Sequence, residues 1–223
     1  MQKKKKVNKS EFIMKRKDNY WWEQTLVKLL KPLIIRLVDS PITPNMVTLF
    51  NMLVVLPVIC VVAYFQIYYL LAILIQIYAS LDIVDGNLAR NKNKKSELGR
   101  KLDILADTIF YTVGYAFVGM GMKVHLGWIV VFIGVQQIYG IIATFFIVPR
   151  MRRIENFEHT KVKQFFFDRG IIFGMDAIME TLITSILLLL PIRKGIFMIC
   201  PILWGIDLIY RLYELLCVNR NAR

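Results

Sequence analysis

Histidine and cysteine are scarce in this sequence, and acidic residues are few. The 223 residues include two histidines and three cysteines, and the cysteines stand far apart with no Cys-x2-Cys pair or Cys/His cluster. This composition excludes a zinc-binding motif and a disulfide framework. Asp and Glu number 16 against 29 Lys and Arg, which gives a formal net charge of +13. The excess does not by itself indicate nucleic-acid binding, because its meaning depends on where the basic residues lie.

Hydrophobic residues, by contrast, are abundant. They make up 57% of the chain, and the mean hydropathy is +0.51. Both values exceed those of soluble domains, so the composition predicts a membrane protein and excludes a soluble enzyme of several domains. Six apolar stretches are each long enough to cross a bilayer. They are residues 46–65, 67–90, 102–122, 126–148, 171–191 and 195–217.

The basic residues alternate between the two sides of these stretches. When the connections are assigned to alternate sides, 26 of the 29 Lys and Arg fall on one side and 3 on the other. The positive-inside rule places the richer side, with both termini, in the cytoplasm. We therefore expect an all-α integral membrane protein with six transmembrane helices. Nothing marks an organelle address, so we expect a bacterial cytoplasmic membrane.

The chain divides into three predicted parts. Residues 1–43 form a basic cytoplasmic N-terminus, whose lysines suit an anionic membrane surface. Within it, residues 24–38 predict an amphipathic helix at the interface, with Trp21 and Trp22 at the headgroup level. Residues 44–218 are the six-helix catalytic domain, and residues 219–223 are a short cytoplasmic tail.

Four aspartates stand where a membrane helix should be apolar. Asp82 and Asp85 lie at the cytoplasmic end of the second stretch, and Asp103 and Asp107 at the start of the third. Carboxylates are costly in a bilayer, so four together need compensation. Helical spacing predicts two faces: Asp82, Asp85, Gly86 and Ala89 on one, and Gly99, Asp103 and Asp107 on the other. Because only eight residues separate Arg90 from Gly99, the helices are antiparallel and can bring the carboxylates together.

A site of four carboxylates without histidine or thiol suits Mg²⁺ or Mn²⁺, and we expect two ions. Such ions can clamp a diphosphate for an in-line displacement. Gly86 and Ala89 leave the helix bare for a ligand, and Arg90 can complement phosphate charge. The residues alone therefore predict a metal-dependent enzyme that acts on a diphosphate at the cytoplasmic boundary.

The same residues resemble the signature of the CDP-alcohol phosphotransferase family. Every fixed position matches in the string Asp82-x2-Asp85-Gly86-x2-Ala89-Arg90-x8-Gly99-x3-Asp103-x3-Asp107. Eight identities at fixed spacing are a specific signal. The segment Thr43-Pro44-Asn45-x2-Thr48 also resembles the start of the family's first membrane helix.

The resemblance implies a fold, a reaction and a set of site residues. Members of the family have six transmembrane helices after an amphipathic helix, and most are homodimers. They transfer a substituted phosphate, here expected to be phosphatidyl from a donor such as CDP-diacylglycerol, to an alcohol in phospholipid synthesis, and release CMP. The metal positions match Asp82, Asp85, Asp103 and Asp107, and Asp107 also matches the proposed general base. The nucleotide-binding positions match Asn45, Thr48, Asp82, Gly86, Ala89 and Arg90.

The alcohol acceptor stays open at this point. Family members with phosphorylated acceptors often carry Lys or Arg directly after the last aspartate, where this chain has Thr108. Basic residues on the same side of the membrane can bind an acceptor phosphate or simply set the topology. The candidates are Arg150, Arg152 and Arg153, with Lys161 and Lys163 nearby.

Two alternative functions also fit part of the pattern. A membrane prenyltransferase uses aspartates and Mg²⁺ to hold a diphosphate, but it typically has two separated motifs and more spans. A cation transporter uses carboxylates inside the membrane, but its site tends to lie near the midplane rather than towards one side.

Overall fold

The computed structural model describes residues 21–147, 149–150 and 174–221, and every regular element in these ranges is a helix. The predicted all-α architecture is therefore confirmed for the described residues. The elements are α1 (Trp21–Val38), α2 (Pro44–Phe50), η2 (Asn51–Val55), α3 (Leu56–Tyr64), α4 (Tyr68–Asn91), α5 (Glu97–Ile109), η3 (Phe110–Gly114), α6 (Tyr115–Gly121), α7 (Leu126–Ile142), η4 (Ala143–Ile147), α10 (Ala177–Leu189), η5 (Arg193–Gly195) and α11 (Ile196–Asn221).

Five continuous helices are long and apolar enough to cross a membrane, so the chain is an integral membrane protein. They are Pro44–Tyr64, Tyr68–Asn91, Glu97–Gly121, Leu126–Ile147 and Arg193–Leu216. The predicted stretch 171–191 contains α10, which has 13 residues. At 1.5 Å per residue this helix is about 20 Å long, shorter than a hydrocarbon core of about 30 Å. The six-span count and the orientation therefore stay predictions.

Side-chain caps fix where several helices begin. Thr43 caps α2, and Pro44 occupies its first turn, where the missing N–H costs nothing. Ser96 Oγ accepts a hydrogen bond from the backbone N–H of Gly99 at 3.0 Å. This cap starts α5 at Glu97, ahead of the apolar stretch predicted from residue 102, because a capped first turn tolerates polar residues.

Three of the spans contain one π-helical turn each. These turns are η2 in the first span, η3 in the third and η4 in the fourth. A π-helical turn takes one more residue than an α-helical turn, and such turns are frequent at functional sites. Apolar periodicity gave no sign of them.

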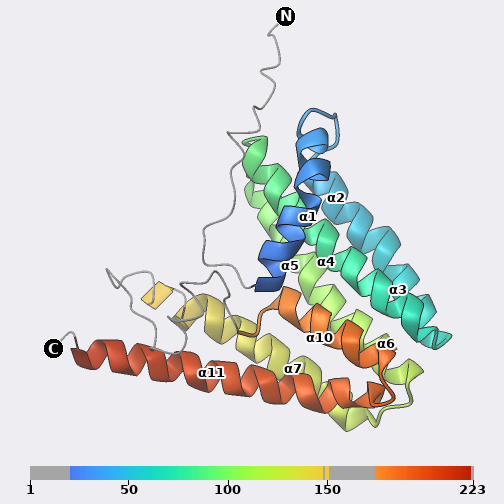
Figure 1. The fold of residues 1–223 in the computed structure, drawn as a ribbon, viewed down its shortest axis with the longest axis vertical. Helices are drawn as coiled ribbons and strands as arrows, with labels where there is room; N and C mark the ends of the chain where they lie inside the picture. The colour runs from blue at the N-terminus through green and yellow to red at the C-terminus, as the bar shows by residue number, and fades with distance from the viewer. Residues whose placement is uncertain (1–20, 148, 151–173, 222–223) are drawn as a thin grey trace, which may run out of the picture.

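Helix α4 lies at the centre of the bundle (Figure 1). Helices α1, α2, α3 and α10 all pack against it, and α11 packs along α7. The helix predicted over residues 24–38 exists within α1, and its buried Leu26 and Val27 pack on Ala79 and Ile83 of α4, while its place at the membrane interface stays a prediction. Trp22, predicted at the headgroup level, donates from Nε1 to Gln76 Oε1 of α4 at 3.1 Å. Helix α1 is therefore packed against the bundle.

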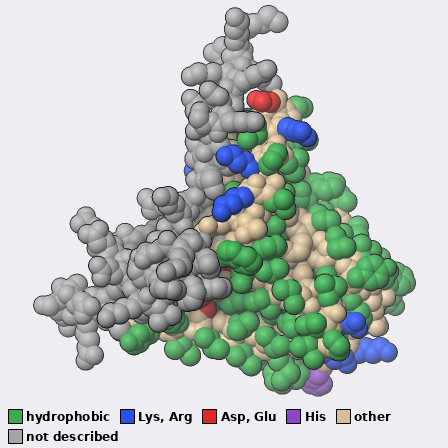
Figure 2. Space-filling view, viewed as in Figure 1, with side chains coloured by type: hydrophobic (Ala, Val, Ile, Leu, Met, Phe, Trp, Pro, Cys, Tyr) green, Lys and Arg blue, Asp and Glu red, His purple; other side chains and the backbone are tan. Residues whose placement is uncertain are grey.

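Hydrophobic side chains cover much of the described surface drawn in Figure 2, and Lys and Arg gather towards its ends. Large apolar residues stay exposed along the spans, among them Tyr64, Tyr69 and Ile209, each more than 60% accessible. In a membrane protein such side chains contact lipid.

Helices α3 and α6 approach each other closely at Gly121. A Cβ atom built on Gly121 would lie 2.2 Å from the backbone oxygen of Ala63, at the end of α3. Backbone cannot move aside as a flexible side chain can, so only glycine fits this crossing.

A polar cluster joins α7, α11 and the segment before α10. Asp207 accepts hydrogen bonds from the hydroxyl of Tyr139, from the backbone N–H of Met175 at 3.2 Å and from Arg211 Nε at 2.6 Å. The Asp207 and Arg211 side chains are only 10% and 12% accessible. Asp207 therefore satisfies three donors at a largely buried position.

Candidate functional site

The carboxylates of Asp82, Asp85 and Asp103 converge at one end of the bundle. Each offers one oxygen atom, and these three atoms all lie within 4.8 Å of one another. Asp82 and Asp85 belong to the C-terminal half of α4, and Asp103 belongs to α5. The structure therefore brings together three of the four aspartates singled out by their spacing.

A short reversal between α4 and α5 makes this convergence possible. Helix α4 ends at Asn91 and α5 begins at Glu97. Asn93 has a φ of 52°, in the left-handed region that asparagine tolerates better than most residues. The backbone N–H of Lys94 bonds to the carbonyl of Ala89 at 3.0 Å. The chain thus turns back within a few residues, as the eight-residue spacer of the motif predicted.

Asp107 stands slightly apart from the other three. It lies one helical turn beyond Asp103 in α5 and is not part of the 4.8 Å group. Its carboxylate nevertheless interacts electrostatically with those of Asp103 and Asp85. The four aspartates are thus arranged as a group of three with a fourth beside it.

The first span supplies a direct contact to the carboxylate group. The hydroxyl of Thr48 in α2 donates to Asp85 Oδ2 at 2.6 Å, and both residues are buried. A buried carboxylate needs such a donor, because an unpaired one would be costly. Thr48 therefore fixes the orientation of one of the three converging carboxylates.

Asn45 in the first turn of α2 packs against Gly99 of α5. A Cβ atom built on Gly99 would lie 2.9 Å from Asn45 Oδ1 and 3.1 Å from Ser96 Oγ. The missing side chain of Gly99 therefore lets the start of α2 approach the start of α5. Through Asn45 and Thr48, α2 contacts both helices that carry the aspartates.

Arg90 extends over Gly86 on the same face of α4. A Cβ atom built on Gly86 would lie 3.6 Å from both terminal nitrogens of the Arg90 guanidinium. Arg90 interacts electrostatically with Glu23 of α1, and then with Asp85, Asp82 and Asp103. Its buried Nε has no hydrogen-bond partner among the described residues. A buried donor of this kind suits an anionic ligand.

Sequence reasoning missed two residues that support the site. Asn51 Nδ2 donates to the backbone oxygen of Tyr78 at 3.0 Å, and Tyr78 donates from its hydroxyl to the backbone oxygen of Ala106 at 3.0 Å. The Tyr78 ring also stacks on Phe110, with centroids 4.0 Å apart. These contacts join the first, second and third spans just outside the aspartates. The polar Asn51 within an apolar stretch was the one signal that could have found them.

The predicted acceptor residues are only partly within the described ranges. Arg150 is exposed, and its Nη1 donates to the backbone oxygen of Phe146 at 3.4 Å. Its guanidinium also lies 5.6 Å from the ring centroid of Phe146. Arg152 and Arg153 lie outside the described residues, as do Lys161 and Lys163. The role of these basic residues stays a prediction.

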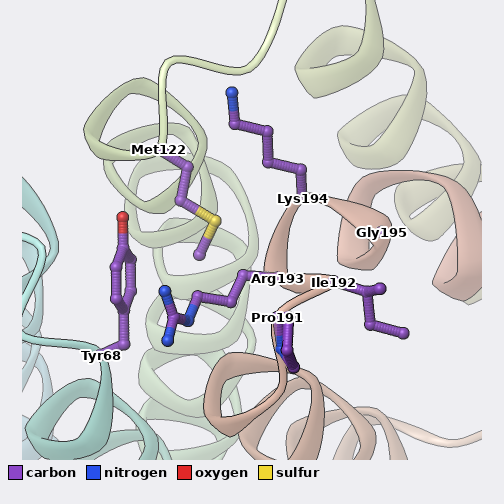
Figure 3. A pocket seen from close by; sticks show the side chains of 7 residues that line it. All are labelled: Tyr68, Met122, Pro191, Ile192, Arg193, Lys194 and Gly195. Carbon is purple, nitrogen blue, oxygen red and sulfur yellow. The ribbon is translucent and has the colours of Figure 1, made fainter.

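A pocket at the opposite end of α4 is separate from the aspartates. It encloses about 460 Å³ beside Tyr68, Met122 and Arg193 (Figure 3). Arg193 donates from Nε to the carbonyl of Leu188 at 2.9 Å, and its guanidinium lies 4.4 Å from the Tyr68 ring centroid. These contacts cap the end of α10, so we assign Arg193 a structural role. Tyr68 begins α4 and the aspartates lie near its end, so this pocket does not serve them.

Comparison with known families gives one result that covers most of the chain. A family model described as CDP-alcohol phosphatidyltransferase matches residues 41–206. The matched range contains α2, α4 and α5 and therefore every residue of the site that they form. A search of curated proteins found no match.

Proposed function

The chain belongs to the CDP-alcohol phosphatidyltransferase family, and from this premise we propose that it moves a substituted phosphate group, phosphatidyl in our proposal, from a CDP-linked donor to an alcohol. CMP is the second product. The observation that supports this function most is the convergence of Asp82, Asp85 and Asp103 within 4.8 Å. Two helices of an apolar chain hold these carboxylates together, an arrangement that a bound cation would stabilise.

The carboxylate group fits a divalent metal of the hard type. Its ligands are all oxygen atoms, which suits Mg²⁺ or Mn²⁺. In this proposal Asp82, Asp85 and Asp103 are ligands, and Asp107 completes the set beside Asp103. Bound ions would offset the negative charge of the carboxylates and stabilise charge that develops on the diphosphate. Thr48 holds Asp85 in place for this role.

The donor nucleotide is proposed to lie over the bare face of α4. Gly86 and Ala89 present little side chain there, so a diphosphate can approach the helix closely. The buried Nε of Arg90 supplies a donor for a phosphate oxygen. Asn45, Thr48 and Asp82 border the same region and complete the proposed nucleotide site.

Asp107 is the proposed general base. It accepts the proton of the acceptor hydroxyl as the hydroxyl oxygen bonds to the phosphorus that carries the substituent. The bond from that phosphorus to the oxygen bridging to CMP breaks, and CMP leaves with the electron pair. Asp107 lies one helical turn from Asp103 and outside the group of three converging carboxylates, so in this proposal it both contributes to metal binding and faces the acceptor.

Several finer points rest on the family likeness and on charge patterns. Thr108 follows Asp107 and donates its hydroxyl to the backbone oxygen of Ile104 at 2.7 Å, so no cation stands directly after the base. Serine, a simple polyol or a lipid alcohol would suit this arrangement as the acceptor. If the acceptor is phosphorylated, the proposed contacts for its phosphate are Arg150, Arg152 and Arg153. A homodimer in a bacterial membrane, with its site facing the cytoplasm, completes the proposal.

Ligand-dependent thermal unfolding tests the donor site without knowledge of the acceptor. The chain in detergent is heated with Mn²⁺, with and without CDP, beside an Asp82→Asn variant. A ligand at 100 times its dissociation constant stabilises the native state by about 2.7 kcal/mol. We expect stabilisation by CDP that needs metal and is lost in the variant. Stabilisation by prenyl diphosphate instead of CDP would favour a prenyltransferase. A response to metal alone, with metal flux into proteoliposomes, would favour a transporter.

A further inference from the structure

Lys92 ties the end of α4 to the loop that leads into α2. The residue caps the C-terminus of α4, and its Nζ donates to the backbone oxygen of Ser40 at 2.7 Å and to that of Ile42 at 2.6 Å. Hydrogen bonds from an ammonium group are stronger than neutral ones. One side chain thus holds two carbonyl groups that lie about fifty residues earlier in the chain.

The loop that Lys92 holds is itself stiff. Ser40 Oγ donates to the backbone oxygen of Leu37 at 2.8 Å and accepts from the backbone N–H of Ile42 at 3.2 Å. Pro41 and Pro44 lie within the same short segment and restrict its φ angles. Thr43 then accepts from the backbone N–H of Met46 at 3.3 Å and begins α2. A clamp on this loop therefore fixes where α2 starts.

The start of α2 meets both halves of the aspartate motif. Asn45 packs against Gly99 of α5, and Thr48 donates to Asp85 of α4. An unbroken path of contacts therefore leads from Lys92 through the loop to the carboxylate site. Lys92 lies among the eight residues between Arg90 and Gly99 that the motif leaves variable. From the sequence, its charge indicates only that this connection faces the cytoplasm.

We propose that Lys92 is a positioning residue for the donor nucleotide site. Lys92 acts through the start of α2, because it sets Asn45 against α5 and Thr48 against α4. This proposal rests on the function proposed above. Topology alone does not account for Lys92, because a charge that only faces the cytoplasm needs no hydrogen bonds to two carbonyls of a partly buried loop. Lys94 and Lys95 in the same connection are exposed, whereas Lys92 is partly buried.

Substitution of Lys92, with a matched control, tests this proposal. Lys92→Met removes the donors and keeps most of the side-chain length, Lys92→Arg keeps charge and donors, and Lys95→Met removes an exposed charge from the same connection. We expect Lys92→Met to weaken CDP binding in the presence of Mn²⁺ at least tenfold. Lys92→Arg should recover most of the affinity, and Lys95→Met should match the wild type. If Lys92→Met does not fold, Lys92→Gln replaces it and should show a smaller loss in the same direction.

A triple variant separates positioning from general stability. If Lys92 acts through α2, Lys92→Met should weaken CDP binding much less when Asn45→Ala and Thr48→Val are already present. Fully additive losses would contradict this route. Turnover measured beside binding should fall chiefly through the KM for the donor.

A distance measurement checks the positioning itself. Spin labels at Met46→Cys and Leu98→Cys, both exposed positions, report the separation of α2 and α5 in a chain without its native cysteines. Lys92→Met should broaden this distance distribution, and Lys95→Met should not. Unchanged CDP affinity and an unchanged distribution in Lys92→Met would overturn the proposal. Failure of the wild type to bind CDP would instead contradict the proposed function.

Discussion

Thr48 in the first span holds Asp85 in the second through a buried hydrogen bond of 2.6 Å. The two residues are 37 positions apart, so the bond forms only when the two spans are correctly packed. It fixes the rotation of a carboxylate whose two neighbours, Asp82 and Asp103, lie within 4.8 Å. The geometry of the proposed metal site therefore depends on a residue that is not itself a ligand.

Replacing Thr48 tests this dependence. Thr48→Val removes the hydroxyl at nearly constant volume, and we expect Mn²⁺ affinity to fall about tenfold or more, as for other residues that orient metal ligands. Titration of free Mn²⁺ by electron paramagnetic resonance measures the change. Thr48→Ser, which keeps the donor, is the control and should bind nearly as well as the wild type. Equal affinities in all three proteins would show that the bond does not matter for the metal.

Substitution of Asp107 should chiefly reduce turnover, whereas substitution of Asp103 should chiefly reduce metal-dependent binding of CDP. Asp107→Asn should lower turnover by at least about a hundredfold, because general base catalysis contributes factors of this size. CDP binding in the presence of Mn²⁺ should fall less than turnover, since the three converging carboxylates remain to hold metal when Asp107 is replaced. Asp103→Asn should instead abolish metal-dependent CDP binding. Calorimetry measures the CDP binding of each variant, and a CMP-release assay measures its turnover. Full activity in Asp107→Asn would contradict the role of Asp107 as general base.

Gly86→Ala should impair binding without impairing the fold. The added Cβ would lie 3.6 Å from the Arg90 nitrogens, an ordinary contact, and alanine favours helix by about 1 kcal/mol over glycine. The unliganded protein should therefore unfold at the same temperature or slightly higher. CDP affinity should drop, because the methyl group occupies the face that the diphosphate approaches.

Gly121→Ala is the matched control for Gly86→Ala. Here the same methyl group would lie 2.2 Å from the backbone oxygen of Ala63, so α3 and α6 must move apart. Overpacking of this kind costs roughly 1–3 kcal/mol, and the unfolding temperature should fall. Equal effects of the two substitutions on stability would contradict this difference.

Asp207→Ala should destabilise the protein at a distance from the reaction. The change removes the carboxylate that accepts from Nε of the largely buried Arg211 and is also the acceptor for Tyr139 and Met175. Breaking a buried ion pair on one side costs about 3–5 kcal/mol. The double variant Asp207→Leu/Arg211→Met should unfold closer to the wild type, since it removes the cation together with the carboxylate. A double variant no more stable than Asp207→Ala would show that the ion pair is not the source of the loss.

The spacing of the motif predicted much of the site. Asp82 and Asp85 had to share a helix face with Gly86, and the short spacer forced α5 back alongside α4, so the meeting with Asp103 followed from local geometry. Five of the six predicted spans coincide with helices that are long and apolar enough to cross a membrane, as apolar length alone predicted. The pattern could not reveal contacts between distant positions, such as Asn51 with Tyr78 or Lys92 with Ser40. Such contacts depend on how the helices pack, and the local periodicity of a sequence does not determine that packing.

The π-helical turn η3 keeps one stripe of residues in line along the third span. In an α-helix every fourth residue drifts around the axis by about 40°, because four steps exceed one turn. The wider turn at Phe110–Gly114 rotates the chain in the opposite sense and offsets that drift. Gly99, Asp103 and Asp107 are therefore continued inward by Tyr111 and Tyr115, which are buried and stacked 5.7 Å apart. One irregular turn thus lets a single row of side chains change, within one span, from aspartates to a pair of buried, stacked tyrosines.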